Sequence, residues 1–162
     1  MPKPTKYYSS LQEHRIADYY GWSVVVASGA RPFHPGDVKS SKWLAECKTH
    51  TKETDKLTIS KAVWRKLSNE AKSLRKIPIL FIDNGTQKID NTWAVVQGRC
   101  IDGQGFENID APLNVSEGQI TFKHSDFKPL YKGKKAGVSI FVDGNTLYII
   151  RATDLQEIVG EK

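Results

Sequence analysis

Short apolar segments bounded by turn residues predict strands along most of the chain, since β-branched and aromatic residues favour a pleated backbone. The predicted strands are residues 22–27, 37–38, 43–50, 77–82, 92–97, 138–142 and 146–150. Residues 22–27 and 77–82 are nearly continuous in apolar side chains, which is typical of strands buried on both faces. An Asp-Gly pair at 143–144 predicts that the last two strands form a hairpin.

A first helix is predicted over residues 7–20, with Ser9 or Ser10 as its N-cap and Gly21 at its end. Glu13 then has two interpretations. It fits a capping box with Ser10, in which its side chain bonds back to the start of the helix. Alternatively, it points toward a functional site as an additional acid. The spacing favours the cap.

A second helix is predicted to begin at Thr58 or Ser60 and to end near Lys76. Its apolar stripe has near-helical spacing and consists of Ile59, Val63, Leu67, Ala71 and Leu74. A last helical segment is predicted at residues 154–159. This order of elements predicts an α/β fold with a mixed central sheet flanked by helices.

The 162 residues are expected to form a single domain without internal repeats. The core covers about residues 7–97. Residues 98–137 are rich in Gly, Asn and Asp, and we expect a largely loop-like insertion there with a possible strand at 119–123. Residues 138–162 add a β-rich C-terminal extension, whose apolar hairpin edge belongs either to the core or to a dimer surface.

The candidate chemistry lies at Asp37, Glu46 and Lys48. Side chains alternate along a strand, so Glu46 and Lys48 share one face of the strand at 43–50, and the preceding turn brings Asp37 toward them. Two carboxylates that bind a hard cation beside one ammonium group are what metal-dependent phosphodiester hydrolysis requires. The alternative is the ordinary exposed face of an edge strand, because Glu and Lys two residues apart are common there.

The net charge of +6 is concentrated in one part of the chain. Residues 39–76 contain eleven basic and four acidic residues, a net charge of +7. A solvated lysine-rich helix would explain part of this excess. Candidate metal ligands inside a basic region nevertheless favour a polyanionic partner, above all nucleic acid.

Neither the cysteines, the apolar segments nor the N-terminal residues indicate secretion or membrane insertion. Cys47 and Cys100 lack metal-ligand spacing and are expected to be reduced, with Cys47 in the core. No apolar run approaches the length of a membrane span, and residues 1–6 lack the apolar core of a signal peptide. We therefore expect a cytoplasmic protein without a membrane partner.

Several of these segments together resemble the archaeal-type Holliday junction resolvases of the PD-(D/E)xK nuclease superfamily. The resemblance spans roughly residues 10–83. It rests on Glu13, Ser28-Gly29, Gly36-Asp37-Val38, Leu44-Ala45-Glu46-Cys47-Lys48 and Ile77-Pro78-Ile79-Leu80. Gly36 stands where that family often has proline, and the loop before Asp37 is longer.

The resemblance implies a restriction-endonuclease-like core and a homodimer that cuts four-way DNA junctions with Mg²⁺ or, as a substitute, Mn²⁺. It matches Asp37 and Glu46 to the metal-binding carboxylates and Lys48 to the catalytic lysine. It matches Glu13 to a helix-borne acid that is a possible further metal ligand, and Ser28 to a loop serine near the scissile phosphate. The backbone carbonyl of Cys47 would complete the metal ligands.

Basic and polar side chains beyond the metal site are expected to follow DNA phosphates without reading sequence. The DNA-binding candidates are Ser28, Arg31, Lys52, Lys61, Arg65, Lys132, Lys134 and Lys135. Two other functions stay open: a nickase or duplex endonuclease of the same superfamily, and a non-catalytic DNA-binding protein on a nuclease-like fold.

Overall fold

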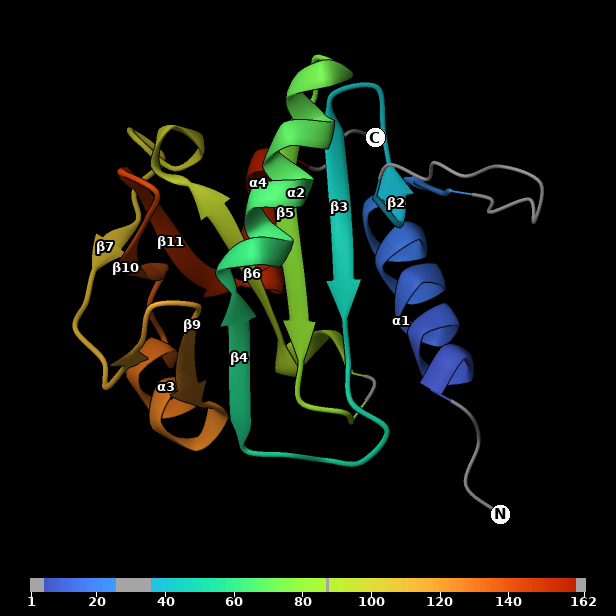
Figure 1. Ribbon diagram of the computed structural model, residues 1–162. Coiled ribbons are helices and arrows are strands. Elements are labelled where there is room, and N and C mark those ends of the chain that lie inside the picture. Colours follow the sequence, from blue (N-terminus) through green and yellow to red (C-terminus); the bar gives the residue numbers. More distant parts are fainter. Residues whose placement is uncertain (1–4, 26–35, 87, 160–162) are drawn as a thin grey trace.

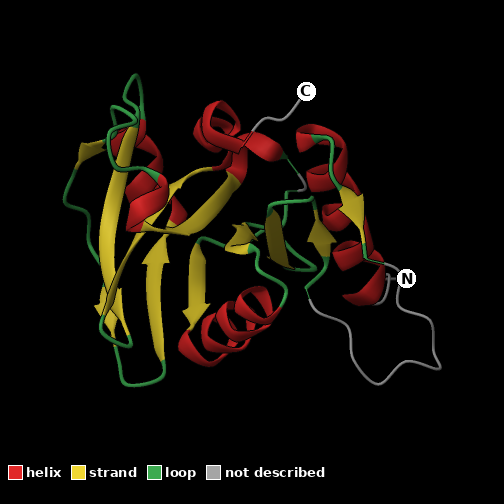
Figure 2. Ribbon diagram, turned by 90° about the horizontal axis from the view of Figure 1, so that it is seen from above, coloured by secondary structure: helices red, strands yellow, loops and turns green. Residues whose placement is uncertain are grey.

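The protein is built on a large mixed β-sheet with helices on both faces, as seen in the computed structural model (Figures 1 and 2), which describes residues 5–25, 36–86 and 88–159. The helices are α1 (Thr5–Tyr20), α2 (Lys61–Ser73), α3 (His124–Tyr131) and α4 (Ala152–Val159), with 3-10 turns η1 (Ile89–Asn91) and η2 (Gly98–Cys100). The strands are β1 (Ser23–Val24), β2 (Val38–Lys39), β3 (Trp43–Lys48), β4 (Lys56–Ser60), β5 (Ile77–Asp83), β6 (Thr92–Gln97), β7 (Glu107–Asn108), β8 (Asn114–Val115), β9 (Gln119–Lys123), β10 (Ala136–Val142) and β11 (Asn145–Arg151).

The large sheet has the strand order β1-β2-β3-β5-β6-β11-β10-β7, and a smaller antiparallel sheet has the order β4-β9-β8. In the large sheet, β1, β2 and β3 are antiparallel neighbours, whereas β3 and β5 are parallel. A parallel pair needs a crossover connection, which α2 provides after the chain has passed through β4. The predicted α/β class with a mixed central sheet flanked by helices is confirmed.

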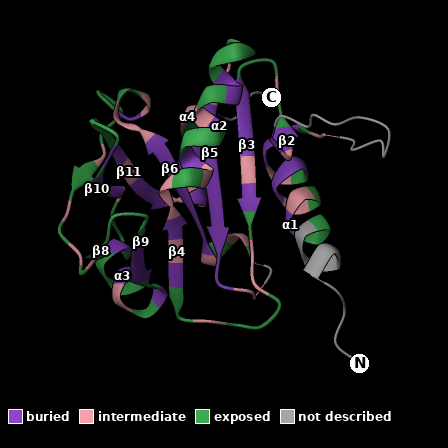
Figure 3. Ribbon diagram, viewed as in Figure 1, coloured by how far each residue is buried: buried purple, intermediate pink, exposed green. Residues whose placement is uncertain are grey.

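Two apolar cores lie on the two faces of the large sheet. Leu44 of β3 packs in the core that α2 covers, whereas Ala45 and Cys47 pack in the core that α1 and α4 cover. This division follows from the alternation of side chains along a strand. Cys47 is buried and unpaired, which confirms its prediction as a core residue. The purple stretches of β3 and β5 in Figure 3 mark these buried positions.

The N-terminal region differs from its prediction in two respects. Helix α1 begins at Thr5, so Ser9 and Ser10 lie inside the helix and neither is its N-cap. The capping-box interpretation of Glu13 is therefore wrong. The strand predicted at 22–27 is only the short edge strand β1 within the described residues, and Ser23 is exposed there rather than buried.

The region before α2 forms strand β4, although the spacing of its apolar residues predicts a helix. Ile59 has helical spacing from Val63, yet it lies in β4 and is buried there. Ser60 is the N-cap, because its side chain accepts a hydrogen bond from the Val63 amide. The helix ends at Ser73 rather than near Lys76, and Leu74 is exposed.

Residues 98–137 contain more regular structure than the sequence predicts. The predicted strand at 119–123 is confirmed as β9, which pairs with β4 and β8. Helix α3 follows it directly and was not predicted. Pro129 lies in the second half of this helix, and a proline there argues against a helix in a sequence-based reading. The region thus forms part of a second sheet instead of a loop.

The C-terminal hairpin agrees with its prediction. Asp143 and Gly144 both have positive φ, 51° and 81°, as a two-residue type I′ hairpin turn requires. The apolar side chains of Ile140 and Ile149 are buried in the core, which answers the open question about this hairpin in favour of core packing. Phe141 points outward and is 65% exposed. None of the helices in the described ranges has the length and apolar character needed to cross a membrane.

Trp93 and His124 link the two sheets and give the fold a pH dependence. The Trp93 indole donates a hydrogen bond to Nδ1 of His124 over 3.0 Å, and both side chains are buried. Burial, and then the charge of Lys128, lower the pKa of His124 below its ordinary value. The unfolded chain therefore binds a proton more readily than the folded chain, so stability falls as pH decreases below about 6.5.

We expect the His124→Gln variant to lose this acid sensitivity, because an amide oxygen still accepts a hydrogen bond but does not titrate. Urea unfolding of both proteins between pH 5 and pH 8 measures it. The free energy of unfolding of the variant should change less across this range than that of the wild type. Parallel curves would show that His124 is not the group responsible.

Candidate metal and phosphodiester site

Asp37 is fixed against the middle of β3, just before β2 begins. Its backbone amide donates to the carbonyl of Ala45 over 2.7 Å, and its carboxylate Oδ2 accepts from the amide of Cys47 over 2.8 Å. The carboxylate therefore extends the pairing of β2 with β3 by one residue. Because Gly36 has a φ of +68° and a Cβ there would lie 2.7 Å from Leu44, a glycine suits the turn that delivers Asp37.

Glu46 lies next to Asp37 in a largely buried position. Its side chain is 17% exposed, and Lys48, 53% exposed, places its Nζ 3.9 Å from Glu46 Oε2. Burial raises the pKa of Glu46 to about 8, and so do its hydrogen bond to Asp37 and the negative charge of Asp37, whereas Lys48 and Lys66 act in the opposite direction. The two carboxyl groups thus share a site that lacks sufficient positive charge.

Helix α1 brings Glu13 toward the same carboxylates. Burial, and then the charge of Asp37, raise the pKa of Glu13 to about 7, while His14 and Lys48 lower it. Because α1 begins at Thr5, Glu13 is not part of a helix cap, and its other interpretation, as an additional acid at the site, stays a prediction.

The oxygen donors at this position fit a hard divalent cation. Asp37 and Glu46 supply carboxylates whose mutual repulsion a cation would relieve. The amide of Cys47 points to Asp37, and in a strand the carbonyl of the same residue faces the same edge, so this carbonyl fits a third ligand. Within the described ranges, no three side chains of His, Cys, Asp or Glu form a ready metal site, so Glu13 does not complete one.

A buried polar network behind the site holds α1 against the ends of β3 and β5. The Gln12 side chain has no exposed surface, and its amide donates to the backbone carbonyl of Lys48 over 2.9 Å. Arg15 approaches the buried Asp83 to 3.6 Å, and Thr49 donates to the same carboxylate. These contacts tie the helix that carries Glu13 to the strand that carries Lys48.

The predicted DNA-binding residues differ in their surroundings. Arg65 and Asp143 form an ion pair of 2.9 Å, and Lys61 donates to the carbonyl of Ser116 rather than facing the end of β3. Lys134 and Lys135 approach Glu107 and Glu157, at 3.9 and 2.8 Å. Lys52 and Lys132 are exposed. Ser28 and Arg31 lie outside the described residues.

Sequence reasoning missed Gln12 and Lys66. Lys66 was grouped with the general charge of its region, yet it is the cation of α2 that acts on Glu46. The position of Lys66 in the helix gave only a weak signal for a role at the site. It follows the N-cap Ser60 by almost two turns and is next to Leu67 in the sequence. Gln12 gave none, because a glutamine beside a candidate acid reads as exposed helix surface.

The raised pKa of Glu46 leads to an expectation for the protein without divalent cations. A carboxyl group whose pKa is raised from 4.5 to about 8 on folding destabilises the folded protein as pH rises through that interval. In EDTA at pH 9, we expect Glu46→Gln to exceed the wild type by about 2 kcal/mol in free energy of unfolding, a value reduced for partial exposure. Below pH 4.5 the free energies of unfolding of the two proteins should be equal. A difference between them that does not depend on pH would contradict the raised pKa of Glu46.

Comparisons with protein-family models, with curated proteins and with solved structures find no match to this chain. The resemblance to resolvases therefore remains a prediction from the residues themselves, and the chemistry of the site has to carry the functional conclusion.

Proposed function

We propose that this protein is a metal-dependent DNA endonuclease with a core of the PD-(D/E)xK type. The observation that carries the proposal is the position of the largely buried Glu46, 3.9 Å from the Lys48 ammonium group, on the strand against which the Asp37 carboxylate is held by the Cys47 amide. An isolated edge strand would expose Glu46 to water. Here Glu46 is largely buried against a second carboxyl group, an arrangement that costs stability unless a cation or proton offsets it.

The order of elements supports the same proposal. Asp37 precedes β2, Glu46 and Lys48 lie on β3, and β3 is flanked by antiparallel β2 and parallel β5. Helix α1 comes before these strands, and α2 lies between β3 and β5. This is the sequence of elements and site residues that the resemblance to resolvases implies.

Each residue of the site then has a defined role. Asp37, Glu46 and the Cys47 carbonyl would hold the cation, with Glu13 adding negative charge from α1. When bound there, Mg²⁺ supplies Lewis acidity and a water of lowered pKa. Lys48 is half exposed, so its ammonium group would reach the attacking water or offset the charge that develops on the phosphoryl oxygens.

The proposed substrate is DNA, and within DNA a four-way junction. The net charge of +6 favours a polyanion. The preference for junctions comes from the resemblance, as does the homodimer, since two symmetric cuts in a two-fold junction suit two identical sites.

Cleavage of a labelled synthetic four-way junction, beside a linear duplex of matched sequence, tests the proposal in the presence of Mg²⁺. Paired symmetric nicks confined to the junction would establish a resolvase. Equal cutting of both DNAs would keep the site roles and identify a duplex endonuclease or nickase. Binding without any cutting by a folded protein would favour the non-catalytic alternative and refute the proposal.

A further inference from the structure

Two lysines lie directly opposite each other at one end of the smaller sheet. Lys56 begins β4 and Lys123 ends β9, and they are partners in the antiparallel register. Both are exposed, and neither forms an ion pair with a carboxylate in the described part of the chain. Like charges directly opposite each other destabilise a strand pair. An anionic ligand between the two ammonium groups would be attracted by both.

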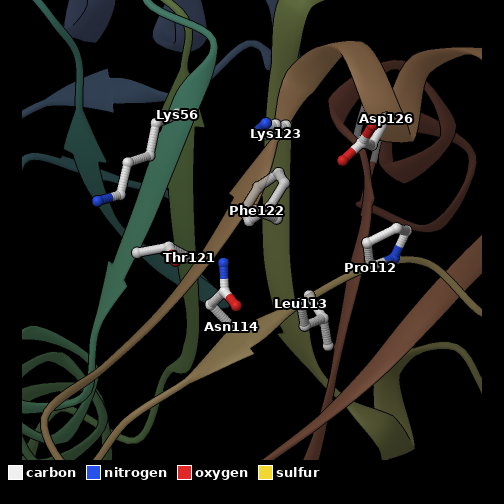
Figure 4. A pocket seen from close by; sticks show the side chains of 8 residues that line it. All are labelled: Lys56, Pro112, Leu113, Asn114, Thr121, Phe122, Lys123 and Asp126. Atoms are coloured by element: carbon white, nitrogen blue, oxygen red, sulfur yellow. The ribbon is translucent and has the colours of Figure 1, made fainter.

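The surroundings of this lysine pair form a pocket whose lining is largely apolar and includes Pro112 and Leu113. Lys56 and Lys123 line a pocket of about 260 Å³, together with Asn114, Thr121 and the ring of Phe122 (Figure 4). The carboxylate of Asp126 also lines it, on the side away from Lys56.

The nearby carboxylate of Asp55 is hydrogen-bonded to Ser125, which lowers the pKa of that carboxyl group, although the charge of Lys123 also contributes to the lowered pKa. Its two oxygens accept hydrogen bonds from the amide and the hydroxyl of Ser125, each over 2.7 Å. The lysine pair thus contrasts with Arg65, Lys134 and Lys135, each of which has a carboxylate partner within 4 Å.

The lysine pair and Lys48, the last residue of β3, lie toward the same end of the molecule (Figure 1). The loop over residues 49–55 leads from Lys48 at the end of β3 to Lys56 at the start of β4 (Figure 1). Thr54 donates to the carbonyl of Asn84 just beyond β5, and the amide of His124 donates to the carbonyl of Asp55. These backbone hydrogen bonds fix the loop to the ends of β5 and β9.

The spacing suits one DNA molecule that contacts both places. The eight residues from Lys48 to Lys56 span at most about 29 Å, whereas one turn of duplex DNA is about 34 Å long. A duplex whose scissile phosphate lies beside Lys48 therefore extends far enough to reach Lys56 within a single turn.

We propose that Lys56 and Lys123 bind the phosphate backbone of the DNA arm that flanks the cleavage site. This inference rests on the proposed nuclease function and adds a contact to it. The strand register places two positive charges at neighbouring positions, and neither forms an ion pair among the described residues, so a phosphate bound there would gain attraction from both. The contact is to backbone phosphates and does not depend on DNA sequence.

Equilibrium binding of a fluorescent junction in EDTA, over a series of salt concentrations, tests this contact. The Lys56→Gln/Lys123→Gln variant should bind at least about tenfold more weakly at 0.1 M salt, and the slope of log affinity against log salt should fall by about two. The matched control is Lys72→Gln/Arg75→Gln, which removes two exposed charges at the far end of α2 (Figure 1). It should bind closer to the wild type than the first variant and keep most of the salt slope.

A single substitution separates binding from folding. Lys123→Glu places opposite charges across the strands, so its melting temperature should equal or exceed that of the wild type while its DNA affinity falls. A melting temperature and an affinity that fall together would overturn the proposal, and so would an affinity equal to that of the control. If the wild type binds and cuts DNA, such a result refutes the lysine contact alone. A wild type that neither binds nor cuts refutes the nuclease function as well.

Discussion

Replacing Lys48 by alanine is expected to lower the single-turnover rate of DNA cleavage by at least about 100-fold, the typical cost of removing one group that stabilises developing charge. Lys48 is the ammonium group nearest to Glu46 among the described residues, at 3.9 Å, and half of its side chain is exposed toward solvent. Strand β3 contains no second lysine or arginine that would replace it. The measurement is the cleavage rate of a labelled junction at saturating protein and Mg²⁺.

DNA binding should distinguish a catalytic role from a binding role for Lys48. The variant loses one exposed charge, so its affinity should fall only severalfold while the rate falls by a much larger factor. Lys72→Ala is the matched control, since it removes an exposed lysine of α2 far from the site. A Lys48→Ala protein that cuts at the wild-type rate would contradict the assigned role.

Replacing Trp93 by alanine is expected to cost about 3–5 kcal/mol of folding free energy, as for other large aromatic residues deleted from a core. Trp93 lies on β6 and is 2% exposed. Its ring contacts those of Phe122, Phe127 and Tyr131 at centroid distances of 6.2, 5.6 and 4.8 Å. It therefore joins the large sheet to β9 and α3, and its loss would open a cavity between them.

Thermal or urea unfolding of the Trp93 variants measures this effect. Trp93→Ala should lower the melting temperature by roughly 10 °C, given about 2–4 °C per kcal/mol for a domain of this size. Trp93→Phe keeps an aromatic ring and should lose less, because only part of the volume and the hydrogen bond to His124 disappear. An alanine variant that melts within about 2 °C of the wild type would show that the two sheets do not depend on this residue.

The sequence pattern predicts the large sheet well because its central strands carry strong local signals. Residues 77–82 and 93–96 are continuous in apolar side chains, and the Asp143-Gly144 turn determines its own hairpin. These signals need no knowledge of distant contacts. The smaller sheet gives no such signal, because β4 pairs with residues of β9 that lie 59 to 67 positions away in the sequence.

The site is predictable only in part for a related reason. Alternation along β3 is enough to place Glu46 and Lys48 together, and the turn at Gly36 is enough to bring Asp37 toward them. Glu13 cannot be placed from spacing, because its role depends on where α1 begins, and the helix begins before Ser10. The effect of Lys66 on Glu46 depends on how α2 packs across the sheet, which no local pattern determines.

The most direct test of the account is the Mg²⁺ dependence of junction cleavage by the wild type and by Glu46→Gln. The substitution keeps the size of the side chain and its capacity to hydrogen-bond to Asp37, but it removes one of the two carboxylates. Both proteins should bind the junction in EDTA and unfold cooperatively, so a loss of activity reports on the site itself.

We expect the wild type to cut only when Mg²⁺ is present. At Mg²⁺ concentrations that saturate the wild type, Glu46→Gln should not cut at a measurable rate. Cleavage by the wild type in EDTA, or equal cleavage by the two proteins, would contradict a metal-dependent reaction at Asp37 and Glu46.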